Sequence, residues 1–184
     1  GFCIFNNTAL AASKLLELGF DRIAVIDFDV HHGNGTQEIF YSDPRVLHID
    51  LHEDPAILYP GTGFPIDLGT GEGEGTKINI VLPPGVRDDV YLYALDRIVK
   101  PLLEEYKPQV IIYSAGFDAY EGDGLAHFRL REYSFVALGR LYAELRLDKM
   151  LAVLEGGYET GLMYGLRAFV EAILGQAEGY TPLE

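Results

Sequence analysis

Short apolar runs alternate along the chain with longer segments in which apolar residues recur every three or four positions. The short runs are typical of buried strands, and the longer segments are typical of helices with one apolar face. The predicted strands cover residues 22–27, 46–52, 77–82, 109–114 and 149–154. The predicted helices cover residues 2–18, 36–41, 88–106, 131–145 and 160–174. This alternation indicates an α/β domain with a mainly parallel sheet, and Pro101 is expected to kink or divide the third helix.

Polar residues stand at or just after the ends of several predicted strands. In an extended backbone, side chains two residues apart share a face, so Asp27, Asp29 and His31 are expected to point the same way. The carboxyl ends of parallel strands border the functional crevice of such sheets. The residues expected to face this crevice are Asp29, His31, Asp50, His52, Asp118 and Tyr158.

Two carboxylates and one imidazole in this group have the chemistry of a metal site. Asp29, His31 and Asp118 supply three ligands and leave a coordination position for water or substrate. The alternative is that these polar groups cap neighbouring helices or lie in water. Tyr158 follows Gly156 and Gly157, where the backbone can turn sharply, and its hydroxyl could stabilise an oxygen that gains negative charge.

The remaining histidines are expected to be mainly structural. His32 is adjacent to a ligand but on the opposite face of the strand, so it is assigned a structural role. His48 points away from the polar end of its strand and is expected to be a hydrogen-bonded core or surface residue. His52 and His127 stay open between a structural and a functional role, with the structural one favoured.

Composition narrows the class of protein. A chain of 184 residues with 48% hydrophobic content suits one domain with a sizeable core. Cys3 is its one cysteine, which excludes an internal disulfide and suits a reducing, cytoplasmic compartment, and no membrane span is visible. The net charge of −14 disfavours binding to nucleic acid or anionic lipid and favours cationic substrates, although solubility alone also explains it.

Five segments, in this order, resemble the motif series of the zinc-dependent histone deacetylase family, which includes acetoin-utilisation proteins and acetylpolyamine amidohydrolases. Asn34 and the Glu155-Gly156-Gly157 form are similar to its class II and prokaryotic branch. The resemblance implies a three-layer α/β domain of the arginase/deacetylase type, with residues 1–184 forming the C-terminal part of a single deacetylase domain. The five segments are Gly1-Phe2-Cys3-Ile4-Phe5-Asn6-Asn7, Asp27 to Gln37, Tyr59-Pro60-Gly61-Thr62-Gly63, Ser114-Ala115-Gly116-Phe117-Asp118 and Leu154-Glu155-Gly156-Gly157-Tyr158.

The resemblance also assigns roles to individual residues. It implies that Asp29, His31 and Asp118 bind Zn²⁺, with Fe²⁺, Co²⁺ or Mn²⁺ as possible occupants, and that Tyr158 stabilises the oxyanion. Asp27 matches a residue that orients a catalytic histidine. The positions implied to line the tunnel for the acyl-lysine stem are Gly1, Phe2, Tyr59 and Leu125. A structural K⁺ is implied near Asp27, Asp29, His31, Asp50 and Leu51, although Asp50 stands where a hydroxyl residue is expected.

The family's catalytic base is a pair of adjacent histidines before the Gly-Phe-Cys motif, and this chain starts at that motif. His31-His32 cannot replace the pair, because His31 is assigned as a ligand. We therefore expect a metal-dependent amide hydrolase that acts on acetyl-lysine peptides, acetylated proteins or acetylpolyamines, and expect this chain alone to deacetylate poorly or not at all. The alternatives are an arginase-like binuclear hydrolase, which needs a second metal and more aspartate ligands, and a non-catalytic module that binds acyl-lysine or polyamine.

Overall fold

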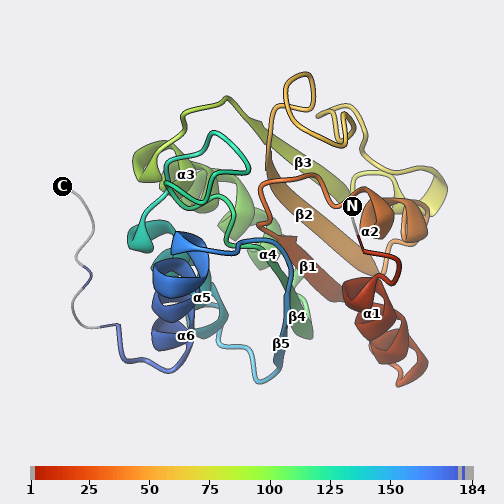
Figure 1. Ribbon diagram of the computed structural model, residues 1–184. Helices are drawn as coiled ribbons and strands as arrows, with labels where there is room; N and C mark the ends of the chain where they lie inside the picture. Colours follow the sequence, from red (N-terminus) through yellow and green to blue (C-terminus); the bar gives the residue numbers. More distant parts are fainter. Residues whose placement is uncertain (1–2, 178–179, 181–184) are drawn as a thin grey trace.

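A computed structural model describes residues 3–177 and 180, so Gly1 and Phe2 lie outside the described residues. Its centre is a five-stranded sheet with the order β3-β2-β1-β4-β5 in which every neighbouring pair is parallel (Figure 1). The strands are β1 (Ile23–Asp27), β2 (Val46–Glu53), β3 (Lys77–Leu82), β4 (Val110–Ala115) and β5 (Met150–Leu154). All five predicted strands are therefore present, and the predicted parallel α/β architecture is confirmed.

Helices cover both faces of the sheet (Figure 1). On one face lie α1 (Asn7–Glu17) and α2 (Asn34–Ile39). The other face carries α3 (Asp88–Ala94), α4 (Lys100–Tyr106), α5 (Glu132–Glu144) and α6 (Arg167–Ile173). A 3-10 turn, η1 (Gly71–Gly73), and two π-helical segments, η2 (Leu95–Val99) and η3 (Gly161–Leu166), complete the elements. Among the described residues, no helix is long and apolar enough to cross a bilayer.

Two hydrophobic clusters hold these three layers together. The larger one, on the α3–α6 face, contains an aromatic group in which Phe28 packs against Phe117 and Phe169 at ring-centroid distances of 5.5 and 5.3 Å. The smaller one joins α1 to the amino-terminal halves of β1, β2 and β4 through residues such as Ala12 and Val25. Towards the carboxyl ends of the strands, on the α1 face, polar residues replace this smaller core.

Strand β2 shows this change of face chemistry most clearly. All eight of its residues are buried, so its alternating pattern does not mark a solvent-exposed side. Leu47, Ile49 and Leu51 belong to the larger core. His48 and Asp50, which point to the opposite face, are fully buried as well. A row of buried polar groups therefore lies between the sheet and the helices on the α1 face.

Differences from the predicted elements have physical reasons. The first helix begins at Asn7, after an Asn6 N-cap that lies in the Asn6-Asn7-Thr8 cluster expected to start it, and the Asn6 side chain accepts a hydrogen bond from the Ala9 N–H at 2.8 Å. Pro101 lies in the first turn of α4, where its missing N–H is tolerated, and the π-helical η2 precedes it. Strand β5 is at the sheet edge, and Leu154 is 56% exposed there rather than buried.

Candidate metal centre

Asp29, His31 and Asp118 form one compact group at the carboxyl edge of the sheet. Asp29 and His31 lie in the bend after β1, and Asp118 lies in the turn after β4. The His31 Nδ1 atom is 3.0 Å from Asp29 Oδ1 and 3.0 Å from Asp118 Oδ2, and the potential ligand atoms all lie within 4.8 Å of one another. The ring nitrogen can carry only one proton, so it can donate a hydrogen bond to only one of the two carboxylates. A cation bound between the three groups could interact with all of them.

Backbone contacts fix the two carboxylates. The Val30 N–H donates to Asp118 Oδ1 at 2.9 Å, and the Gly156 N–H donates to Asp29 Oδ2 at 2.8 Å. Gly156 also leaves the space that the carboxylates fill, because a Cβ atom there would lie 2.6 Å from Asp29 Oδ2 and even closer to Asp118 Oδ2. Gly116 is in the same situation, with a Cβ position 2.5 Å from Asp29 Oδ2. The glycines of both motifs thus form a cradle for the carboxylates.

The charge balance of this group calls for a positive ion. Burial lowers the pKa of His31, but hydrogen bonds with Asp118 and Asp29 outweigh burial and raise it to about 10. Burial and the charge of Asp29 raise the pKa of Asp118 to about 6. The metal-free group therefore keeps a proton on His31 at neutral pH. A divalent cation bound by Asp29, His31 and Asp118 would take the place of that proton, so the donor set fits a metal ion.

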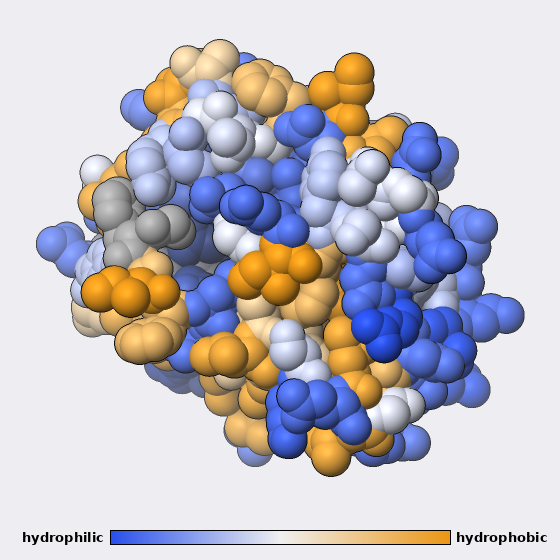
Figure 2. Space-filling model, turned by 90° about the vertical axis from the view of Figure 1, so that its right-hand side faces the viewer, coloured by the Kyte–Doolittle hydropathy of each residue, from blue (hydrophilic) through white to orange (hydrophobic). Residues whose placement is uncertain are grey.

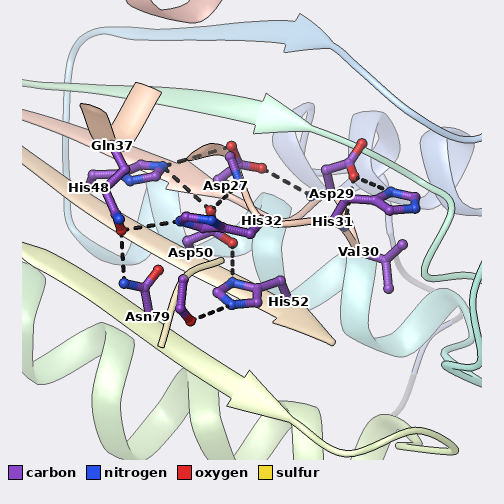
Figure 3. A network of polar contacts seen from close by, with 12 residues as sticks. Asp27, Asp29, Val30, His31, His32, Gln37, His48, Asp50, His52 and Asn79 are labelled. Atoms are coloured by element: carbon purple, nitrogen blue, oxygen red, sulfur yellow. Dashed lines mark hydrogen bonds and ion pairs between the residues drawn. The ribbon is translucent and has the colours of Figure 1, made fainter. Parts of the chain in front are cut away.

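Asp27 belongs to a second group of potential ligands, although it lines the same cavity as Asp29 and His31. Strand β1 ends at Asp27, and the bend that follows turns Asp29 away from it. Asp27 instead aligns in register with Asp50 of β2 and forms a group with Asp50 and His48 (Figure 3). The two groups are linked by a hydrogen bond of 3.2 Å from the Asp29 N–H to Asp27 Oδ1.

His48 corrects the prediction that it is a satisfied core or surface residue. It is fully buried, and neither of its ring nitrogens has a hydrogen-bond partner among the described residues. Its Nε2 atom lies 3.8 Å from Asp27 Oδ2 and 3.7 Å from Asp50 Oδ2, which is too long for hydrogen bonds. Burial lowers the pKa of His48 to about 4, so the ring is neutral at pH 7.

Asp50 and His52 form a buried ion pair rather than part of the crevice, so the prediction that they face it is wrong. The His52 Nδ1 lies 2.7 Å from Asp50 Oδ1, and its Nε2 donates to the Gly63 carbonyl oxygen at 2.9 Å. Burial lowers the pKa of His52, but the charge of Asp50 and the hydrogen bond to it outweigh burial and raise this pKa. His52 thereby fixes the glycine-rich loop to β2, as the structural reading predicted.

His32 also has the structural role that the sequence predicted. Its Nδ1 lies 2.9 Å from Thr62 Oγ1 and its Nε2 lies 3.2 Å from Gln37 Oε1, while the Asn79 amide donates to the same Gln37 oxygen at 2.8 Å (Figure 3). A Cβ atom at Gly63 would lie 2.5 Å from the His32 ring, so the loop packs directly on it. This network joins α2, the loop and β3.

His127 contacts a residue that the sequence did not single out. Glu53, buried at the end of β2, accepts a hydrogen bond from the His127 N–H at 2.9 Å, and its other oxygen lies 2.6 Å from His127 Nδ1. The contact holds residues 120–129, and therefore Leu125, against the sheet. Acidic residues at the ends of predicted strands are the signal that could have indicated Glu53.

Of the remaining predicted site residues, Asp27 lines the cavity beside the candidate metal group, whereas Tyr59, Leu125 and Tyr158 are not among the described residues that line it. Asp27, Asp29, His31 and Glu155 line a cavity of about 310 Å³ together with residues 3–6. Tyr158 is 68% exposed, and its segment is held by a 3.1 Å hydrogen bond from its N–H to Asp123 Oδ2. Tyr59 and Leu125 are 48% and 51% exposed, respectively. On the face shown in Figure 2, hydrophobic residues are interspersed among hydrophilic ones.

Two carboxylates and one imidazole gathered at the carboxyl edge of a parallel α/β domain form a group that could hold a metal ion. Residues 1–174 match the family model of the histone deacetylase domain, and the chain belongs to that family. It is 43% identical to a "Probable deacetylase" of Archaeoglobus fulgidus, in an alignment that covers 99% of this chain and 54% of that protein.

Solved structures confirm the fold. The HDA15 HD domain superposes with a TM-score of 0.89 at 37% identity, covering 96% of this chain and 51% of that one. An acetylpolyamine aminohydrolase from Burkholderia pseudomallei gives a TM-score of 0.87 at 35% identity, with 96% and 51% coverage. This chain therefore spans about half the length of these relatives.

Proposed function

We propose that this chain carries the metal-binding and oxyanion-stabilising part of a zinc-dependent deacetylase, which removes acetyl groups from acetyl-lysine or acetylated amines. The observation that carries the proposal is the Asp29, His31 and Asp118 group, whose ligand atoms lie within 4.8 Å of one another. Asp29 and His31 are each 15% exposed and line the cavity, so the group has an open side. A divalent ion held there supplies Lewis acidity towards an amide carbonyl.

Tyr158 is proposed to donate its hydroxyl hydrogen bond to the carbonyl oxygen as negative charge develops there. Its position supports this role, because Gly156, two residues before it, donates its N–H to the proposed ligand Asp29. Asp123 fixes the same segment from the other side, since its Oδ2 accepts the N–H groups of Tyr158 and Glu159. The tyrosine ring itself stays exposed, as a group that meets an incoming substrate must be.

A proton acceptor from outside this chain completes the proposal. Of the five histidines, His31 is a proposed ligand, His32 and His52 have both ring nitrogens engaged, and His48 is fully buried. His127 is held by Glu53. Asp27, which lines the cavity, is proposed as a positioning residue for an external histidine. The isolated chain should therefore have little or no deacetylase activity.

The substrate is proposed to be cationic apart from its acetylated amine, in a cytoplasmic setting. The net charge of −14 favours lysine-rich segments and polyamines over nucleic acid. Tyr59 and Leu125, both about half exposed, are proposed to contact the aliphatic stem. An arginase-like binuclear centre receives no support, because the two candidate metal groups among the described residues have no residue in common.

The test uses the full-length protein that contains this sequence, loaded with zinc and assayed on an acetyl-lysine peptide and an acetylpolyamine. Tyr158→Phe should lower kcat by about 100- to 1000-fold with unchanged metal content, because one oxyanion donor is lost. Tyr164→Phe is the matched control, because Tyr164 stacks on Tyr120 and is not a proposed site residue. The Tyr164→Phe protein should have the activity of wild type. Wild-type kcat in Tyr158→Phe would remove Tyr158 from the mechanism. Binding of both substrates without turnover would favour the non-catalytic binding module.

A further inference from the structure

Glu53 is a buried carboxylate that is held, among the described residues, by one residue at the surface. It ends β2, and its side chain is completely buried, whereas the His127 side chain is 60% exposed. The His127 N–H donates to Glu53 Oε2 at 2.9 Å, and His127 Nδ1 lies 2.6 Å from Glu53 Oε1. A carboxylate only accepts hydrogen bonds, so the ring donates from a protonated Nδ1. His127 therefore engages both oxygens of a charge that is costly to bury alone.

His127 belongs to a loop that starts at the proposed metal ligand Asp118. The loop is closed at its base, where Tyr120 and Leu130 form a β-bridge. Leu125, which is proposed to contact the aliphatic stem of the substrate, is about half exposed in the outer part of the loop. The base is fixed to the turn that carries Asp118, so the position of Leu125 depends on the contacts that hold the outer part.

Two kinds of contact hold this outer part. Backbone hydrogen bonds join it to the turn after β3, because the Gly85 N–H donates to the His127 carbonyl oxygen at 3.1 Å and the Arg129 N–H donates to that of Val86 at 2.8 Å. The Glu53 side chain supplies the contact with the sheet itself, across 74 residues of sequence. Of these three partners, Glu53 is the one that lies in a strand.

Glu53 also contacts the segment that carries two of the proposed ligands. Its N–H donates to the Val30 carbonyl oxygen at 3.0 Å, and Val30 stands between Asp29 and His31. The Val30 N–H in turn donates to Asp118 Oδ1 at 2.9 Å. The residue that holds the loop is thus hydrogen-bonded to the backbone of the metal-binding segment, and it fixes the loop relative to the metal group.

We propose that the Glu53–His127 pair holds Leu125 at the substrate entrance and thereby sets the affinity for the acyl-lysine stem, an inference that rests on the proposed function. Neither residue acts on the reacting atoms, so both are positioning residues. Without the hydrogen bond from the ring, the loop spends less time in the position that binds substrate. The apparent affinity falls by the same factor, which we expect to be about 10-fold.

The test uses the full-length protein that contains this sequence, loaded with zinc and assayed on an acetyl-lysine peptide. His127→Leu removes the ring donor and should raise KM about 10-fold, with kcat and metal content close to those of wild type. His127→Asn keeps an N–H donor as many bonds from the backbone as Nδ1, so it should restore most of the affinity. Arg129→Lys is the control on the same loop, because it retains the backbone hydrogen bond to Val86, and its KM should equal that of wild type.

A double-mutant cycle connects the pair to Leu125. If His127 acts through Leu125, the free-energy effects of His127→Leu and Leu125→Ala on KM should add to less than their sum. Wild-type KM in His127→Leu, an equal increase in His127→Asn, or fully additive effects would overturn the proposal. These variants leave the buried Glu53 in place, and urea unfolding checks that each one folds.

Peptide affinity is measured separately by fluorescence anisotropy. A full-length protein that does not turn over the peptide would contradict the proposed function. The order of peptide affinities among wild type, His127→Leu and His127→Asn would still test the pair, so the two failures are distinguishable.

Discussion

Gly156→Ala is the sharpest test of how the backbone shapes the metal centre. The new methyl group would overlap Asp118 Oδ2 and lie 2.6 Å from Asp29 Oδ2 and 2.9 Å from Asp118 Cγ. Non-bonded contacts of this kind are relaxed at about 3.5 Å, so Asp29 Oδ2 has to move by about 0.9 Å. Metal–ligand distances tolerate only about 0.2 Å. One methyl group therefore displaces both carboxylates well beyond that tolerance.

The expected loss follows from the displaced ligands. A disturbed ligand environment lowers metal affinity by about 10- to 100-fold, which corresponds to about 1.4–2.7 kcal/mol. The measurement is a competition titration with a zinc chelator on the full-length protein, with circular dichroism to check folding. Gly35→Ala is the matched control, because its Cβ would meet only the Asn6 side chain, at 3.3 Å. If Gly156→Ala bound zinc as tightly as wild type, the absence of a side chain at Gly156 would not be needed to position the two carboxylates.

Three further predictions concern the anchor of the Tyr158 segment, a buried lysine and the aromatic core. Asp123→Ala should lower kcat by about 10-fold without loss of metal, since the Tyr158 segment loses its anchor, and steady-state assays with metal analysis check this. Burial lowers the pKa of Lys77 from 10.5 to about 8, so the folded protein loses this proton first. The free energy of unfolding, measured with urea against Lys77→Met, should therefore rise by up to about 3 kcal/mol between pH 8 and 10.5. Phe169→Ala, which removes a ring 5.1 Å from that of Tyr113, should destabilise the protein by about 3–5 kcal/mol in the same assay.

The elements and the ligand group were predictable from sequence because both rest on local rules. Apolar runs with turn signals located all five strands, with differences of at most one residue at either end. The parallel arrangement then placed Asp118 beside Asp29 although 88 residues separate Asp118 from Val30, whose N–H it accepts. Chain order and strand direction were sufficient for that step.

The resemblance separated Asp27 from the ligands Asp29 and His31, but the alternation rule alone could not, because the separation depends on where β1 ends. The alternation rule holds only in an extended backbone, and the backbone bends immediately after Asp27. His48 was misjudged for a related reason. It was expected to be hydrogen-bonded in the core or at the surface, but α2 and the loop after β2 cover this face, and His48 has no hydrogen-bond partner among the described residues. The packing of distant segments on this face is a tertiary property, and the local sequence around His48 does not reveal it.

Asp27 and Asp29 are two positions apart, yet they serve different groups and are joined by the hydrogen bond from the Asp29 N–H to Asp27 Oδ1. A change that reorients one carboxylate therefore acts on the other through a single turn of backbone. In thermodynamic terms, any effect of a ligand in the interior group on binding at the open group would be matched by an equal effect in the reverse direction. The end of β1 thus connects the open group to the buried interior through one hydrogen bond.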